Sequence, residues 1–107
     1  MLDVHVADTV EAASQNLPSC GFDAKIHELI FCRNNVPIGR FRLLVRMSDY
    51  YADTSFNNSE LPELTQEIRA LIDLLPSRNV LITTLEQFNS TCEEALELGQ
   101  NIYLLCD

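Results

Sequence analysis

Four cysteines and two histidines are the residues of this 107-residue chain that could act as nucleophiles or bind a metal. Neither a C-x-x-C pair nor an H-x₃₋₅-H pair occurs among them, so a zinc site has no support. A Cys–His nucleophile stays open as an alternative, with His5 or His27 as its base. Packing of the thiols in an apolar core is the simpler interpretation. The cysteines are Cys20, Cys32, Cys92 and Cys106.

Carboxylates form the other groups that could do chemistry. Glu93, Glu94 and Glu97 are as crowded as the acids of a general acid–base site, yet carboxylates on a solvated helix face usually titrate normally. Asp49 and Asp53 do not fit the D-x-[DN]-x-[DN]-G pattern of a calcium loop. No G-x-S-x-G, P-loop or G-x-G-x-x-G motif is present. We therefore expect no catalytic residue, no metal and no cofactor, with a Glu-cluster enzyme as the disfavoured alternative.

The charge of the chain is unevenly distributed. Sixteen acidic and seven basic residues give a formal net charge of -9. The first 47 residues carry five of each sign, whereas the remainder carries two basic and eleven acidic residues. Nucleic acid and anionic membrane surfaces would be repelled by such a field, whereas a basic protein would be attracted. The alternative is that the acidic excess serves solubility alone.

Alternation and turn signals predict the elements of the N-terminal half. Residues 2–7 alternate apolar and polar side chains, which indicates a strand. Residues 8–17 are typical of a short helix that begins with the capping-box-like pair Asp8 and Glu11 and stops at Pro18. Residues 18–23 are expected to be a connector. Residues 24–32 and 36–47 are rich in strand-forming residues and predict a hairpin that turns at Asn34 and Asn35.

The register of that hairpin predicts which of its side chains are buried. With the two asparagines as turn residues, Ile26 would face Leu43, and odd-numbered residues of the second strand would form the buried face. That buried face would comprise Phe41, Leu43, Val45 and Met47. Arg40, Arg42 and Arg46 would then lie on the outer face. Two interpretations of these arginines stay open, a solvated face and a patch for an acidic group.

A polar loop with two adjacent tyrosines, residues 48–58, follows. Tyr50 and Tyr51 stand between Asp49 and Asp53, and tyrosines supply contact area at a low entropic cost. The alternative is that both tyrosines extend the preceding strand and pack over the helix ends. Loops of this length often carry function, so the loop is a candidate contact surface.

The C-terminal half predicts two amphipathic helices and a strand. Apolar residues repeat at helical spacing from Leu64 to Leu75, with Pro62 in the first turn and Pro76 after the end. The same spacing continues from Leu81 until Gly99. Residues 101–106 form an apolar run that fits a buried strand. Each helix is expected to carry an acidic ridge opposite its apolar stripe, that of the first comprising Glu60, Glu63 and Glu67.

Together these elements predict one globular domain over residues 1–107 with an α+β fold. The expected architecture is a two-layer sandwich, a mostly antiparallel sheet with two amphipathic helices on one face, because each helix has one apolar stripe to bury. The chain has no run long and apolar enough for a membrane span and no basic n-region of a secretion signal. We therefore expect a cytoplasmic protein with reduced thiols.

A small α+β domain with a hairpin, acidic helices and an Asp/Tyr-rich loop resembles the immunity proteins that bacteria make against polymorphic or contact-dependent toxins. The resemblance covers the size, charge and layout of about the last 70 residues and is carried by no diagnostic motif. It implies a stoichiometric inhibitor, without a catalytic site, that binds a basic toxin domain. The contact candidates are Asp49, Tyr50, Tyr51, Asp53, Glu60, Glu63 and Glu67. A structural subunit that forms a homo-oligomer stays open as an alternative.

Overall fold

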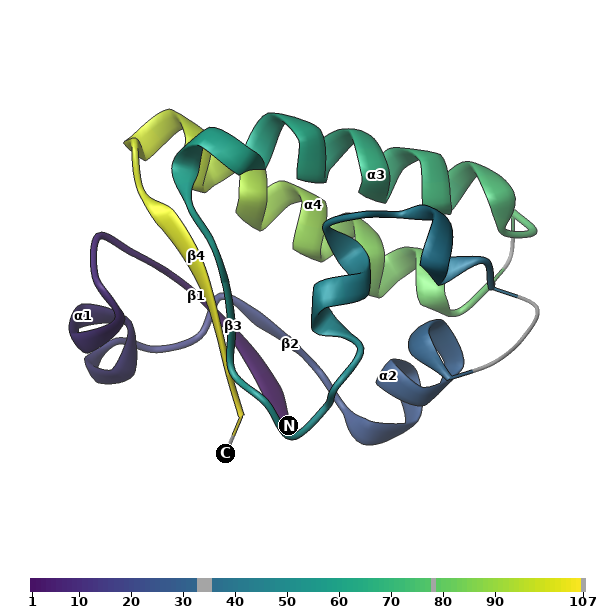
Figure 1. Ribbon diagram of the computed structural model, residues 1–107, viewed down its shortest axis with the longest axis horizontal. Coiled ribbons are helices and arrows are strands. Elements are labelled where there is room, and N and C mark those ends of the chain that lie inside the picture. The colour runs from purple at the N-terminus through teal and green to yellow at the C-terminus, as the bar shows by residue number, and fades with distance from the viewer. Residues whose placement is uncertain (33–35, 78, 107) are drawn as a thin grey trace.

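The computed structural model describes residues 1–32, 36–77 and 79–106 (Figure 1). Its strands are β1 (Leu2–Ala7), β2 (Cys20–Phe22), β3 (Thr54–Phe56) and β4 (Asn101–Cys106). Its α-helices are α1 (Val10–Gln15), α2 (Ala24–Phe31), α3 (Leu61–Leu74) and α4 (Leu81–Leu98). Short 3₁₀ turns are η1 (Ile38–Arg40), η2 (Leu44–Met47) and η3 (Asn58–Glu60).

The four strands form one antiparallel sheet in the order β2-β1-β4-β3. The C-terminal strand β4 lies between β1 and β3, with Val4 opposite Leu104 and Phe56 opposite Ile102. α3 and α4 cover one face of this sheet, whereas α1 lies beyond the other face (Figure 1). The predicted α+β fold, an antiparallel sheet with helices packed against it, is therefore confirmed.

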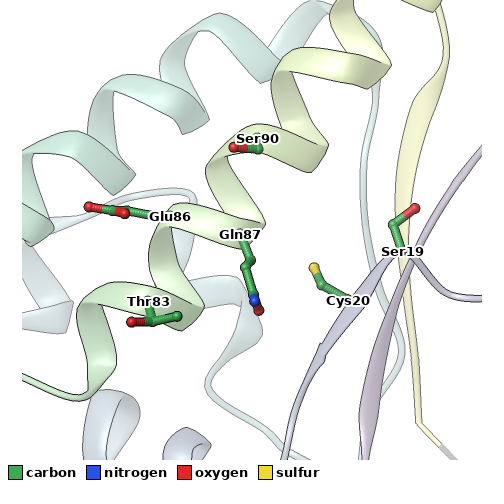
Figure 2. A pocket seen from close by; sticks show the side chains of 6 residues that line it. All are labelled: Ser19, Cys20, Thr83, Glu86, Gln87 and Ser90. Atoms are coloured by element: carbon green, nitrogen blue, oxygen red, sulfur yellow. The ribbon is translucent and has the colours of Figure 1, made fainter.

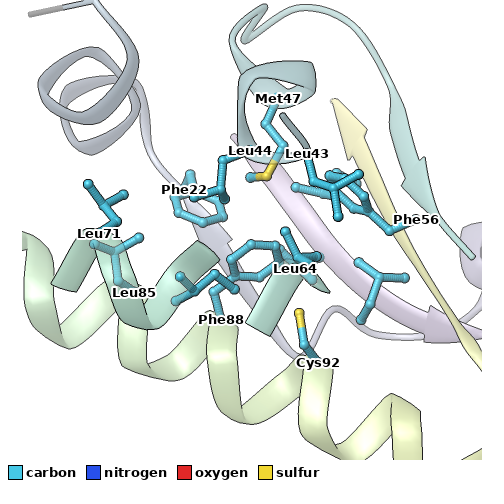
Figure 3. Close-up of a cluster of buried hydrophobic side chains, with 14 of the residues drawn as sticks. Phe22, Leu43, Leu44, Met47, Phe56, Leu64, Leu71, Leu85, Phe88 and Cys92 are labelled. Carbon is cyan, nitrogen blue, oxygen red and sulfur yellow. The ribbon is translucent and has the colours of Figure 1, made fainter. Parts of the chain in front are cut away.

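The core fills the space between the sheet and the two long helices (Figure 3). Phe22 of β2 meets Phe88 of α4 edge to face, with the ring centroids 5.3 Å apart. Phe56 of β3 and Leu64 of α3 are fully buried in the same cluster. Cys92 is also fully buried, as core packing of the thiols predicts, but Cys32 and Cys106 are exposed. Core packing therefore explains only part of the cysteine set.

Elements with strong periodicity lie where the sequence predicts them. The strand at residues 2–7, both long helices and the last strand are confirmed. Gly99 ends α4 in the left-handed region at φ 67°, where its N–H donates to carbonyl groups of the last turn. The short helix α1 is confirmed too, but the expected capping pair is wrong, because Thr9 caps it by accepting a hydrogen bond from the Ala12 N–H.

The predicted hairpin is wrong. Residues 24–31 form the helix α2, because Asp23 caps its first turn through a 2.8 Å bond from the Ile26 N–H, and the apolar residues recur at helical spacing. The expected turn at Asn34 and Asn35 lies outside the described residues. Strand propensity in this segment was overridden by a local cap and by the burial of Ile30.

Residues 36–47 form two 3₁₀ turns instead of the second hairpin strand. The expected pattern of burial fails accordingly, because Val45 is exposed and Leu44, predicted to face outward, is buried. Phe41, Leu43 and Met47 are buried as expected, but in a non-strand segment. The arginines of this segment form no strip on a sheet.

Two short strands lie in segments expected to be irregular. The supposed connector at residues 18–23 contains β2, which pairs with β1. The loop at residues 48–58 contains β3, which pairs with β4 and buries Phe56. Three-residue strands are too short to show an alternation in sequence, so only the pairing partner defines them.

One buried polar group stands out in α4. Asn89 is 2% exposed, its Nδ2 donates to Oε1 of Glu93, and no described residue donates to its Oδ1. Asn89→Leu, which removes this unpaired oxygen at similar volume, is expected to leave the free energy of unfolding unchanged or to raise it by about 1 kcal/mol. Asn89→Ala, the control that leaves a cavity, should lower it by about 1–2 kcal/mol. Urea unfolding measures the free energy of unfolding of both variants. A loss of more than about 1 kcal/mol in the leucine variant would show that the Asn89 side chain stabilises the fold.

Candidate protein-interaction surface

The loop between η2 and β3 presents an exposed tyrosine. Asp49 fixes the loop as a turn, because its Oδ1 accepts the Tyr51 N–H at 2.9 Å and its carbonyl accepts the Ala52 N–H at 3.2 Å. The Tyr51 side chain is 82% exposed. Its ring stands edge-on against the Tyr50 ring, with the centroids 5.3 Å apart. Two hydrogen bonds to Asp49 therefore hold the loop backbone in a turn, while the Tyr51 side chain remains exposed.

Tyr50 connects this loop to α2. Its half-buried ring lies 5.1 Å from the ring of His27, which in turn lies 4.5 Å from Phe31. Nε2 of His27 lies 2.7 Å from the carbonyl oxygen of Met47, and because a carbonyl only accepts, this nitrogen carries the proton. The buried His27 ring therefore packs against Tyr50 and supports the loop. Sequence reasoning missed this role, which the helical spacing of His27 and Phe31 could have indicated.

Asp53 attaches the other end of the loop to the sheet. Its Oδ1 accepts the N–H of Cys106 at 2.9 Å, and the Cys106 thiol donates to the carbonyl of Tyr51 at 3.1 Å. Asp49 and Asp53 themselves are exposed. The loop therefore holds two exposed carboxylates and one exposed aromatic ring at fixed positions beside β4.

A shallow hollow of about 300 Å³ adjoins Asp53. Tyr103 and Leu105 alternate along β4 with the core residues Ile102 and Leu104, so they lie on the sheet face opposite α3 and α4. The hollow is lined by Val10, Asp53, Thr54, Ser55, Tyr103 and Leu105. Together with the Ser48–Asp53 loop it forms a surface that we call the loop surface.

The three glutamates predicted as contacts have partners inside the fold. Glu63 pairs with Arg42 at 2.6 Å, and Glu60 pairs with Arg46 at 2.7 Å. The carboxylate of Glu67 accepts the backbone N–H groups of Leu43 and Leu44 at 3.0–3.1 Å. Glu63 and Glu67 therefore attach residues 42–44 to α3, and Glu60 attaches Arg46 to η3. The structure does not bring them together with the four loop candidates, which lie on a different segment.

The ionisation of Glu60 reflects this internal pairing. Burial opposes the charged form, but the hydrogen bonds from Arg46 and from the Asn57 N–H, together with the charges of Arg46 and Arg42, outweigh it and lower the pKa of Glu60 below its ordinary value. Its carboxylate also completes a capping box at η3, where it accepts the Asn57 N–H. Glu60 is therefore an ionised structural residue at neutral pH.

Two of the thiols and both imidazoles have positions that are explained by the fold. Burial raises the pKa of both Cys20 and Cys92, which disfavours the thiolate that a nucleophile requires. His5 donates through Nδ1 to Oδ1 of Asn16 at 2.7 Å, and His27 supports Met47, so both rings serve the fold. Among residues 1–32, 36–77 and 79–106, no group of three or more His, Cys, Asp or Glu side chains could hold a metal ion.

Comparisons with protein-family models, curated proteins and solved structures gave no match for this chain. No helix in the described ranges is long and apolar enough to cross a membrane.

Proposed function

We propose that this protein is a non-catalytic binding module that holds a basic protein domain, in the manner of a bacterial immunity protein that neutralises a toxin. The observation that carries the proposal is the exposure of Tyr51, 82%, in a turn fixed between two exposed aspartates. Exposed tyrosines on ordered backbone are frequent anchors of protein interfaces. A flanking carboxylate favours an arginine or lysine of the partner beside the ring.

Charge supports a cationic partner. The chain carries a formal net charge of -9, and Arg42 and Arg46 are paired with glutamates. The field of the protein would therefore accelerate the encounter with a basic domain and discourage an acidic one. The four free cysteines fit a reducing compartment, which supports the bacterial cytoplasm as its place of action.

A salt series on the purified complex tests this function. The full chain, tagged and expressed in the cells that encode it, retrieves the partner, which is then purified and titrated between about 50 and 500 mM salt. We expect a basic partner whose association rate falls by about tenfold or more across the series, with a smaller change in dissociation rate. Co-expression of this protein should also restore growth to cells that make the partner.

Three results would contradict the proposal. One is a neutral or acidic partner. The second is an association rate that does not change with salt. The third is a salt-insensitive dimer of the chain alone in size-exclusion chromatography with light scattering, which would favour the structural-subunit alternative.

A further inference from the structure

The two edges of the sheet differ in what covers them. At the β3 edge, Arg46 donates to the carbonyl of Ser55 and accepts the Thr54 hydroxyl at its own carbonyl, 3.1 Å away. Its guanidinium also lies 4.7 Å from the centre of the Phe56 ring. The η2 segment thus occupies this edge and blocks the addition of another strand.

The β2 edge lies instead beside an open groove of about 490 Å³, between β2 and α4 (Figure 2). The groove is lined by Ser19, Cys20, Thr83, Glu86, Gln87 and Ser90. The Cys20 and Gln87 side chains extend toward one another from its two walls (Figure 2). Sγ of Cys20 lies 3.6 Å from Oγ1 of Thr91, a contact that joins β2 to α4 beside the groove.

The lining chemistry favours an extended occupant over a helical one. Helices bind in grooves that offer a series of apolar anchor sites, but five of the six lining residues here are small or uncharged polar residues or a cysteine. An added strand obtains much of its affinity from backbone hydrogen bonds, and an edge strand directs some of its N–H and C=O groups away from its single neighbour. The exposed residue Leu17, two positions before Ser19, offers one apolar contact at the start of the edge.

The charge of the groove favours a cationic occupant. Glu86 is the charged residue of its lining, and α4 carries Glu86, Glu93, Glu94 and Glu97 but no lysine or arginine. The carboxylates of α4 would repel an acidic segment and attract a basic one.

We propose that the β2–α4 groove binds an extended, lysine- or arginine-rich segment of a partner protein, which joins the four-stranded sheet as an additional strand at β2. The groove lies beside α4, whereas the hollow of the loop surface lies on the sheet face opposite α3 and α4, so the inference goes beyond the proposed function and does not depend on it.

The probe for this site is a fluorescent peptide of about nine residues in which lysine and valine alternate, long enough to span a three-residue edge with both ends free. Fluorescence anisotropy measures its affinity for the full chain. We expect Glu86→Lys to weaken binding by about tenfold, and Glu97→Lys, the same charge change on the same helix outside the groove lining, to weaken it by less than about threefold. Tyr51→Ala should leave peptide binding unchanged.

A second peptide of the same sequence, with alternate backbone nitrogens methylated, separates strand addition from charge attraction. It should bind about tenfold more weakly than its parent, because it lacks the N–H donors that face β2. In ¹⁵N–¹H spectra the parent peptide should shift the amides of residues 19–22 and 83–90. Three results would overturn the groove proposal and leave the loop surface untouched. The two peptides could bind with equal affinity, or Glu86→Lys and Glu97→Lys could weaken peptide binding equally. The third result is a set of amide shifts confined to residues 49–53.

Discussion

Tyr51→Ala is expected to weaken binding of the basic partner by about thirtyfold, or about 2 kcal/mol. The side chain is 82% exposed and rests edge-on against Tyr50, so truncation removes the anchor without opening a cavity in the fold. The free energy of unfolding should therefore change by less than about 0.5 kcal/mol. Isothermal titration calorimetry gives the first quantity, and urea unfolding gives the second.

Two controls make this expectation specific. Leu98→Ala removes another exposed apolar side chain, 59% exposed at the end of α4, and should change neither quantity appreciably. Tyr51→Phe keeps the ring and should retain most of the affinity, because the ring supplies most of the contact area. If Tyr51→Ala bound the basic partner with wild-type affinity, the loop surface would not be part of the interface. A large loss of stability would show that the ring supports the fold instead.

Glu67→Ala is expected to lower the free energy of unfolding by about 2–3 kcal/mol and to leave the affinity for the partner unchanged. The half-buried Glu67 carboxylate accepts two backbone N–H groups, those of Leu43 and Leu44. Both leucines are buried, so the alanine variant leaves two donors without an acceptor in an apolar setting. Urea unfolding and calorimetry on the same sample measure the two effects.

Matched variants distinguish this structural role from a general effect of charge. Glu67→Gln keeps one acceptor oxygen and should cost about 1 kcal/mol. Glu63→Ala breaks an ion pair whose side chains are 69% and 46% exposed, and should cost less than about 1 kcal/mol. If Glu67→Ala kept its full stability but lost affinity for the partner, the glutamates would belong to the interface, as the sequence alone suggests.

The elements that could be predicted from sequence are those whose pattern of apolar residues repeats over several helical turns or along most of a strand. α3 and α4 each carry a long apolar stripe, and apolar and polar residue types alternate in β1 from Leu2 to Val6. The sequence predicts a strand at residues 24–32, where the structure has a helix, because Ile, Phe and Leu fit a strand and a helix equally well over such a short run. The Asp23 cap, which decides between them, becomes visible only once a helix is assumed.

The candidate site likewise has features that could be predicted from sequence and features that could not. Residue types alone single out Tyr51 and its flanking aspartates, because these features are local to one loop. The internal role of Glu67 depends on N–H groups 23 and 24 residues away in sequence, at the start of the short 3₁₀ turn η2. Its place on α3 is therefore predictable, whereas its partners are not. The support that His27 gives to Tyr50 depends in the same manner on how α2 meets the loop.

Hydrogen–deuterium exchange, compared between the free protein and its complex with the purified basic partner, tests the location of the interface most directly. We expect slower exchange in the complex for residues 49–56 and 103–106, with unchanged exchange across residues 60–67 of η3 and α3. Unchanged exchange at residues 49–56, with slowing centred on α3, would contradict this expectation.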